Sequence, residues 1–281
     1  MLFGETVGLF LDQNNPDNVV CPESIESKQL YYNAEEDEKV RFLQDLLQQE
    51  ELAGLQERLK KRNMPAGVTV LLHGSPGTGK TETIKQIAKN TGRKIIHVDL
   101  ANVKSMWFGE SEKQVKEIFD SYNNYIKTQD ALPILLFNEA DAIFSSRRET
   151  RQSAVTQTEN AIQNILLEQL EMFEGILVAT TNLTQNLDGA FDRRFLYKIL
   201  FREPSVEVKS MIWQSKLQNF PLEACKDLAR NYKFSGGQID NVAKKVITQE
   251  VLYNSVPDIE KIKRFCEDEF VKKETTRIGY K

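Results

Sequence analysis

The sequence predicts an α/β domain with a parallel five-stranded sheet covered by helices on both faces, followed by a small all-α domain. Three observations predict this fold: short apolar segments without polar alternation, amphipathic segments between them, and the loss of strand signals after Pro204. Continuous apolar segments are typical of strands that are buried on both faces of a parallel sheet. The expected strands are residues 68–73, 94–99, 134–137, 175–180 and 197–201.

Helices are expected where apolar residues recur at helical spacing between and after these strands. The first should begin near Lys80 and end before Gly92, because glycine commonly follows the last helical residue. Ser235 is expected as an N-cap and Pro257 in a first helical turn. The expected helices are residues 80–91, 111–125 and 158–173 in the α/β domain, and 205–218, 222–232, 235–253 and 257–273 after it.

We expect the chain of 281 residues to have three parts: a partly helical N-terminal segment (1–60), the α/β domain (61–203) and the helical domain (204–281). Residues 35–62 are highly charged and carry leucines at near-helical spacing. This pattern predicts one or two amphipathic helices that pack on the following domain.

The composition speaks against several classes of protein. Lys and Arg number 37 and Asp and Glu 41, for a formal charge of −4. This balance disfavours a surface that neutralises nucleic-acid phosphates, although a local basic channel stays compatible. No apolar stretch approaches the roughly 18 residues of a membrane span. The first 27 residues contain no Lys or Arg, and the three cysteines show no metal or redox spacing. We therefore expect a cytoplasmic protein without a membrane partner.

Residues 74–81, Gly-Ser-Pro-Gly-Thr-Gly-Lys-Thr, fit the pattern G-x-x-x-x-G-K-[ST] between an expected strand and an expected helix. The glycines allow backbone N–H groups to surround phosphates, and the positive end of the helix points to the same place. Lys80 should reach the β- and γ-phosphates, and the Thr81 hydroxyl should ligate Mg²⁺. The motif predicts a P-loop NTPase fold with a nucleoside triphosphate and Mg²⁺ as ligands. The expected nucleotide contacts are Gly74, Ser75, Pro76, Gly77, Thr78, Gly79, Lys80, Thr81 and Glu82.

The third expected strand ends in polar residues at the carboxyl edge of the sheet, where ligand sites of such folds form. Glu139 is placed there to orient and deprotonate a water aimed at the γ-phosphate, which favours hydrolysis over transfer to a bound acceptor. Asn138 precedes it, where Asp usually holds the Mg²⁺ shell. An amide keeps an oxygen acceptor but lacks the charge, so Mg²⁺ affinity and turnover stay open.

Residues 65–255 together resemble the AAA ATPases, within the AAA+ class. Thr180-Thr181-Asn182 resembles sensor 1, and the resemblance implies that Asn182 contacts the attacking water and the γ-phosphate. Residues 187–195 resemble the second region of homology, without the insert that usually separates its two arginines. Arg193 and Arg194 are both candidates for an arginine finger that reaches a neighbouring subunit.

Two further segments carry the resemblance. Ser235-Gly-Gly-Gln resembles the sensor 2 turn of the lid, with Gln where many AAA+ proteins have Arg, so the lid is expected to touch nucleotide through Gly236 and Gly237. Trp107-Phe108-Gly-Glu-Ser-Glu resembles a pore loop, in which Trp107 and Phe108 would grip polypeptide; packing in the core is the alternative. Residues 145–152 would form either a second pore loop or a solvated basic loop.

The resemblance implies an ATP-hydrolysing ring motor, a hexamer by family expectation, that remodels or unfolds protein substrates. Asn138 leaves open a second function, a slow or non-hydrolysing nucleotide-dependent assembly switch or scaffold. A DNA-directed AAA+ machine is a third, against which the acidic composition and the Trp107-Phe108 pair speak. The Phe-Asn-Glu-Ala-Asp variant looks most like a group of poorly characterised bacterial AAA proteins.

Overall fold

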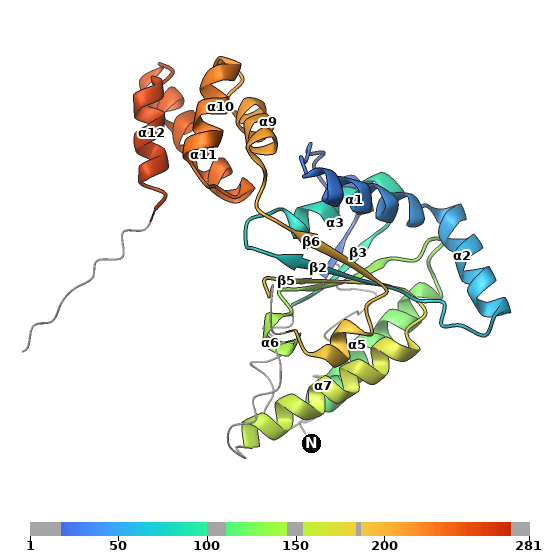
Figure 1. Ribbon diagram of the computed structural model, residues 1–281. Helices are drawn as coiled ribbons and strands as arrows, with labels where there is room; N and C mark the ends of the chain where they lie inside the picture. Colours follow the sequence, from blue (N-terminus) through green and yellow to red (C-terminus); the bar gives the residue numbers. More distant parts are fainter. Residues whose placement is uncertain (1–17, 100–110, 145–153, 184–186, 271–281) are drawn as a thin grey trace, which may run out of the picture. The chain divides into compact units, whose positions relative to one another are not determined.

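A computed structural model of the chain describes residues 18–99, 111–144, 154–183 and 187–270. Its centre is a six-stranded sheet in the order β1-β3-β4-β5-β2-β6 (Figure 1). The strands are β1 (Val19–Val20), β2 (Val68–Gly74), β3 (Ile95–Asp99), β4 (Ile134–Asn138), β5 (Ile176–Thr181) and β6 (Tyr197–Phe201).

Five of these strands are parallel, which confirms the expected parallel sheet. The prediction of five strands was nevertheless wrong by one, because β1 adds an antiparallel strand beside β3. Two valines are too short a segment to give a periodic pattern.

The strand register brings the carboxyl ends of β4, β5 and β2 together. β2 pairs with β5 from Val68↔Ile176 to His73↔Thr181, and β4 pairs with β5 from Ile134↔Ile176 to Phe137↔Ala179. The residues that follow the apolar part of each strand therefore meet at one edge of the sheet. This edge is where an open α/β sheet places its ligands.

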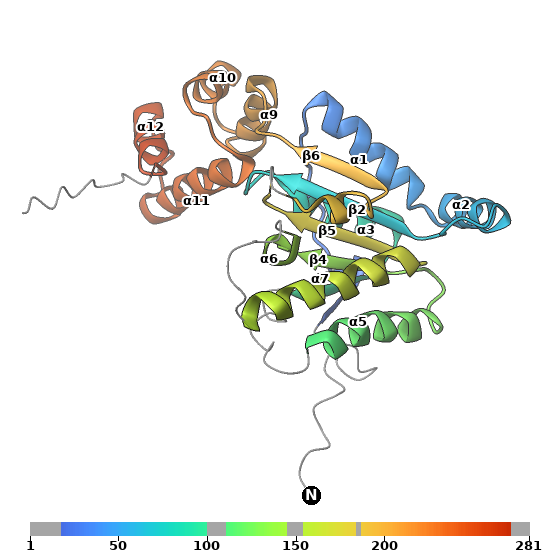
Figure 2. The same cartoon turned by 60° about the horizontal axis from the view of Figure 1, so that its bottom comes forward.

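Helices cover both faces of the sheet, as predicted (Figure 2). α5 (Ser111–Ile126), α6 (Asp141–Phe144) and α7 (Ala154–Met172) lie on one face, and α1 (Ala34–Leu46) and α3 (Lys80–Thr91) on the other. In the core under α5, the ring of Phe119 lies edge-on to those of Phe137 and Phe173, with centroids 5.9 and 5.6 Å apart. Such edge-to-face pairs add to the stabilisation that apolar burial gives.

The described part of the N-terminal segment packs into the α/β unit. It contains a short 3₁₀ helix (Pro22–Ser24), α1 and α2 (Gln49–Lys61), so two helices lie where one or two amphipathic helices were predicted. Arg93 is 1% exposed. Its Nε donates to the carbonyl of Leu47, just past α1, and its Nη1 to that of Leu132, each at 2.7 Å. The guanidinium thus binds the end of α1 to the sheet, and burial lowers its pKa.

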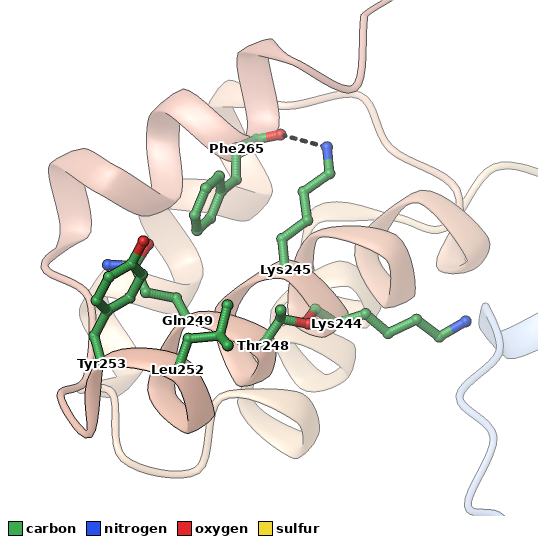
Figure 3. A pocket seen from close by; sticks show the side chains of 7 residues that line it. All are labelled: Lys244, Lys245, Thr248, Gln249, Leu252, Tyr253 and Phe265. Atoms are coloured by element: carbon green, nitrogen blue, oxygen red, sulfur yellow. Dashed lines mark hydrogen bonds between the residues drawn. The ribbon is translucent and has the colours of Figure 1, made fainter.

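The chain divides into two compact units after Arg202, and residues 31–33 and 76–78 group with the second. That unit contains α9 (Val206–Lys216), α10 (Leu222–Asn231), α11 (Gly236–Tyr253) and α12 (Ile259–Glu267). Its core surrounds the fully buried Trp213. A shallow pocket of about 370 Å³ lies between α11 and α12, lined by Lys244, Lys245, Thr248, Gln249, Leu252, Tyr253 and Phe265 (Figure 3).

The caps of the last two helices can be compared with the sequence. Ser235 is the N-cap of α11, as predicted, and its side chain and that of Gln238 form a reciprocal capping box. The placement of Pro257 in a first helical turn was wrong. Asp258 caps α12 instead, its side chain accepting a hydrogen bond from the Lys261 N–H at 2.8 Å. Within the described residues, no helix combines the length and apolar character that a membrane crossing needs.

Candidate functional site

The predicted phosphate loop connects β2 to α3 with the backbone shape that an anion site needs. Gly74, Gly77 and Gly79 have φ values of +142°, +75° and +94°. A Cβ on Gly74 would lie 2.0 Å from the carbonyl oxygen of Phe201, so only glycine fits there. Gly79 is the N-cap of α3, so the free N–H groups of that helix open onto the loop. The loop fits the phosphates of a nucleotide on these grounds.

Lys80 is the first residue of α3 and is 7% exposed. Its ammonium donates to the carbonyl oxygens of Gly74 at 2.8 Å and Ser75 at 2.9 Å, and to Asn182 Oδ1 at 3.0 Å. Burial lowers the pKa of Lys80, while the carboxylates of Asp141 and Glu139 oppose this shift. The predicted lysine and the predicted sensor asparagine are thus in direct contact.

Asn138, at the end of β4, accepts two hydrogen bonds through Oδ1. One comes from the hydroxyl of Thr81 at 2.8 Å and the other from that of Thr180 at 2.9 Å. The two residues predicted to hold Mg²⁺ are therefore in contact, and both provide oxygen, the ligand atom that Mg²⁺ prefers. Among the described residues, no group of three or more His, Cys, Asp or Glu side chains could hold a metal ion by itself.

Glu139 follows Asn138 and is exposed at the same edge of the sheet. Its φ of +54° is uncommon for a residue with a side chain. The Glu139 N–H donates to Thr180 Oγ1 at 3.1 Å, and the next N–H, of Ala140, donates to the Thr180 carbonyl at 2.9 Å. These bonds to β5 hold the sharp turn that follows β4.

Asn182 contacts Asp141 as well as Lys80. The Asn182 N–H donates to Asp141 Oδ1 at 2.7 Å, and its Nδ2 donates to Asp141 Oδ2 at 3.1 Å. The hydroxyl of Thr181 also donates to Asp141 Oδ1. One carboxylate therefore holds two consecutive residues at the end of β5.

The structure distinguishes the two arginine-finger candidates. The Nη2 of Arg194 lies 3.0 Å from Glu171 Oε2, and its backbone carbonyl accepts from the Thr69 hydroxyl at 2.8 Å. Arg193, at the C-cap of α8 (Gly189–Asp192), is exposed and has no ion pair with any described residue. Among the described residues, Arg194 therefore has an ion-pair partner in Glu171, whereas Arg193 has none.

The remaining predicted site residues fall in several places. Glu82, in the first turn of α3, accepts from Gln86 Nε2 at 3.0 Å and lies 3.5 Å from Lys28 Nζ. Gly236 and Gly237 are the first two residues of α11. Trp107, Phe108 and residues 145–152 lie outside the described residues. Their contacts with nucleotide or polypeptide stay predictions.

Sequence reasoning quoted three polar residues of this site within motifs but gave them no role of their own: Thr180, Thr181 and Asp141. All three follow the apolar part of a strand at the carboxyl edge, and that position was the available signal. Their roles depend on which strands are neighbours, and the sequence does not state this.

Comparisons with known proteins agree with this geometry. Residues 70–203 match the sequence profile of the "ATPase family associated with various cellular activities (AAA)". Protein CdcH of Halobacterium salinarum is 32% identical over 191 residues, which are 64% of this chain and 24% of that protein. Cell division protein C of Sulfolobus acidocaldarius is 29% identical over 174 residues, 59% of this chain and 46% of that protein.

A human protein is similar over a comparable stretch. The pachytene checkpoint protein 2 homolog is 32% identical over 164 residues, 53% of this chain and 38% of that protein. The chain thus spans less than half the length of each of these three relatives.

A solved structure shares the fold. The crystal structure of the FIGL-1 AAA domain in complex with ADP superposes with a TM-score of 0.64 and 17% identity, covering 91% of this chain and 88% of that one. Residues 70–203, which contain the phosphate loop and the polar residues that follow β4 and β5, thus match the AAA family of ATPases.

Proposed function

We propose that the chain binds ATP and hydrolyses it to ADP and phosphate at the carboxyl edge of β2, β4 and β5. The observation that carries the proposal is the contact of Lys80 with Asn182, beside the paired Asn138 and Thr81. This cluster brings the phosphate-loop lysine, the sensor asparagine and two oxygen donors to one edge. A charged lysine there stabilises negative charge as it develops on the transferred phosphoryl group.

Glu139 is the proposed general base. A water attacks the γ-phosphorus, a new P–O bond forms, and the bond to the β,γ-bridging oxygen breaks. The proton of the water passes to Glu139, and ADP and phosphate leave. Thr81 and Asn138 would hold Mg²⁺, which when bound offsets the negative charge of the phosphates.

We further propose that the chain assembles into a ring, a hexamer by analogy with the family, in which Arg193 completes the site of a neighbouring copy. Its exposure and the absence of an ion pair within the described residues support Arg193 over Arg194. Replacing Arg193 by Ala should lower turnover by about 10³-fold or more while ATP binding persists. Arg194→Ala should instead lower stability, because it loses the contact with Glu171.

The proposed substrate is protein, moved by Trp107 and Phe108 through a central pore, in the cytoplasm and without a role for nucleic acid. This part rests on the resemblance of residues 107–112 to a pore loop. Trp107→Ala should keep most ATP turnover yet lose protein remodelling. Full remodelling by that variant would contradict the proposed role of Trp107 in a pore loop.

Asn138 supports a second candidate function, a nucleotide-dependent assembly switch with slow or negligible turnover. Its Oδ1 accepts from both hydroxyls as a carboxylate would, but it brings no negative charge. Asn138→Asp keeps both bonds and adds the charge. A large gain in turnover from this change would favour the switch, and little change would favour the motor.

Steady-state turnover by the purified chain tests the proposal. The wild type should release phosphate from ATP, and Lys80→Ala should abolish this release because the phosphates lose their buried cation. Lys85→Ala, a lysine on the same helix, is the matched control and should behave as the wild type. Equal turnover by Lys80→Ala would show that the site lies elsewhere.

A further inference from the structure

The orientation of the Asn182 side chain is fixed by its two partners. Its Nδ2 donates to Asp141 Oδ2 at 3.1 Å, and its Oδ1 accepts from Lys80 Nζ at 3.0 Å. A carboxylate accepts hydrogen bonds and an ammonium only donates them. Turning the amide around would therefore lose both bonds, because it would place the amide nitrogen against the Lys80 ammonium and the amide oxygen against the Asp141 carboxylate.

Asp141 is itself firmly held. It begins α6, and its Oδ1 accepts from the Asn182 N–H at 2.7 Å and from the hydroxyl of Thr181. Thr181 is 1% exposed, and its hydroxyl also accepts from the Leu183 N–H at 3.1 Å. The Asp141 carboxylate is therefore hydrogen-bonded to Thr181 and Asn182 at the end of β5, and supporting bonds of this kind keep a site group oriented.

We propose that Asp141 is a positioning residue that makes Asn182 act as a hydrogen-bond acceptor in the reaction. Asp141 holds the amide nitrogen, which leaves Oδ1 directed to Lys80 and to the water beside the γ-phosphate. A water that donates one hydrogen to Asn182 Oδ1 and the other to Glu139 turns a lone pair toward phosphorus. This inference rests on the proposed ATP hydrolysis and deepens it, since the amide does not serve as a donor to the phosphate.

A reciprocal exchange tests the proposal. Asp141→Asn should lower kcat for ATP about 10- to 100-fold while KM changes less than about threefold, because the reacting water loses its orientation. Asn182→Asp brings two carboxylates into contact and should lower kcat at least as much. In the double variant the new carboxylate at 182 accepts from Lys80 and from the new amide at 141. The kcat of the double variant should be at least about tenfold higher than the value expected if the fold-losses of the two single variants multiplied.

Two further variants separate orientation from charge and from general damage. Asp141→Glu keeps the charge but displaces the carboxylate, and it should also lower kcat. Asp258→Asn is the matched control, because its side chain caps α12 at the Lys261 N–H with an oxygen that Asn also provides. That control should keep the kcat of the wild type.

The outcomes distinguish this proposal from the one on which it rests. Absence of turnover in the wild type would refute ATP hydrolysis. The Tm of each variant is then the measurement that tests the exchange of Asp141 and Asn182: both single variants should have a lower Tm than the wild type, and the double variant should recover it. With an active wild type, three results would overturn the role of Asp141: unchanged kcat in Asp141→Asn, unchanged kcat in Asp141→Glu, or a double variant no better than the product of the singles. Lack of recovery in Tm would overturn it in an inactive wild type.

Discussion

Thr180→Val removes the hydroxyl that connects the ends of β4 and β5. In the structure this hydroxyl donates to Asn138 Oδ1 at 2.9 Å and accepts from the Glu139 N–H at 3.1 Å. Thr180 is 2% exposed, so water cannot readily replace it. Valine has nearly the same shape and leaves no cavity, so the variant isolates the two hydrogen bonds.

The size of the effect follows from these contacts. Leaving a buried donor unpaired costs about 1–3 kcal/mol, and a net hydrogen bond contributes about 0.5–1.5 kcal/mol. Asn138 Oδ1 keeps its bond from Thr81, so the larger loss falls on Glu139. We expect the free energy of unfolding to drop by about 2 kcal/mol. Without this bond, Glu139 is less firmly held at its φ of +54°, and kcat should fall about tenfold or more.

Urea unfolding and steady-state ATP turnover measure the two effects on the same preparation. Thr180→Ser is the matched control, because it keeps the hydroxyl and loses only a methyl group, and it should retain most of the turnover. Wild-type values of both quantities in Thr180→Val would refute the reasoning. Equal loss of turnover in Thr180→Ser and Thr180→Val would do so too, since it would assign the effect to packing.

Two other predictions concern the α/β unit. Arg93→Met leaves the carbonyls of Leu47 and Leu132 without their buried donor, so the free energy of unfolding should fall by about 3 kcal/mol. Hydrogen exchange in α1 should become faster, and unchanged exchange there would contradict the anchoring role of Arg93. Burial lowers the pKa of His73 below 6.5, so the unfolded chain binds a proton more readily and stability falls as the pH drops from about 6.5 toward the folded-state value. In His73→Gln, the free energy of unfolding should depend less on pH between pH 7 and 5. An unchanged pH dependence would exclude His73 as the cause.

The sequence was sufficient where the signal is local. The phosphate loop could be predicted because Gly74, Gly79 and Lys80 each satisfy a requirement of one short backbone segment. The parallel strands could be predicted because continuous apolar segments separated by helices allow few other folds. The N-cap at Ser235 was predictable for the same reason, since a capping box involves only four consecutive residues.

The rest depends on contacts between distant segments. Asp141 and Thr181 lie 40 residues apart, and only the pairing of β4 with β5 brings their neighbourhoods together. Arg193 and Arg194 are equivalent in the sequence, and only the position of Glu171 on α7 separates them. The two-residue strand β1 exists because β3 offers an edge for pairing, and no pattern in Val19–Val20 could reveal that.

The most direct test of the account is the identity of the nucleotide recovered from the purified chain after incubation with ATP. The wild type should yield ADP and phosphate, whereas Glu139→Gln, which lacks the base but keeps the phosphate loop, should retain uncleaved ATP. ATP left intact by the wild type, or ADP formed by Glu139→Gln at the wild-type rate, would contradict hydrolysis by Glu139 at the carboxyl edge of β4.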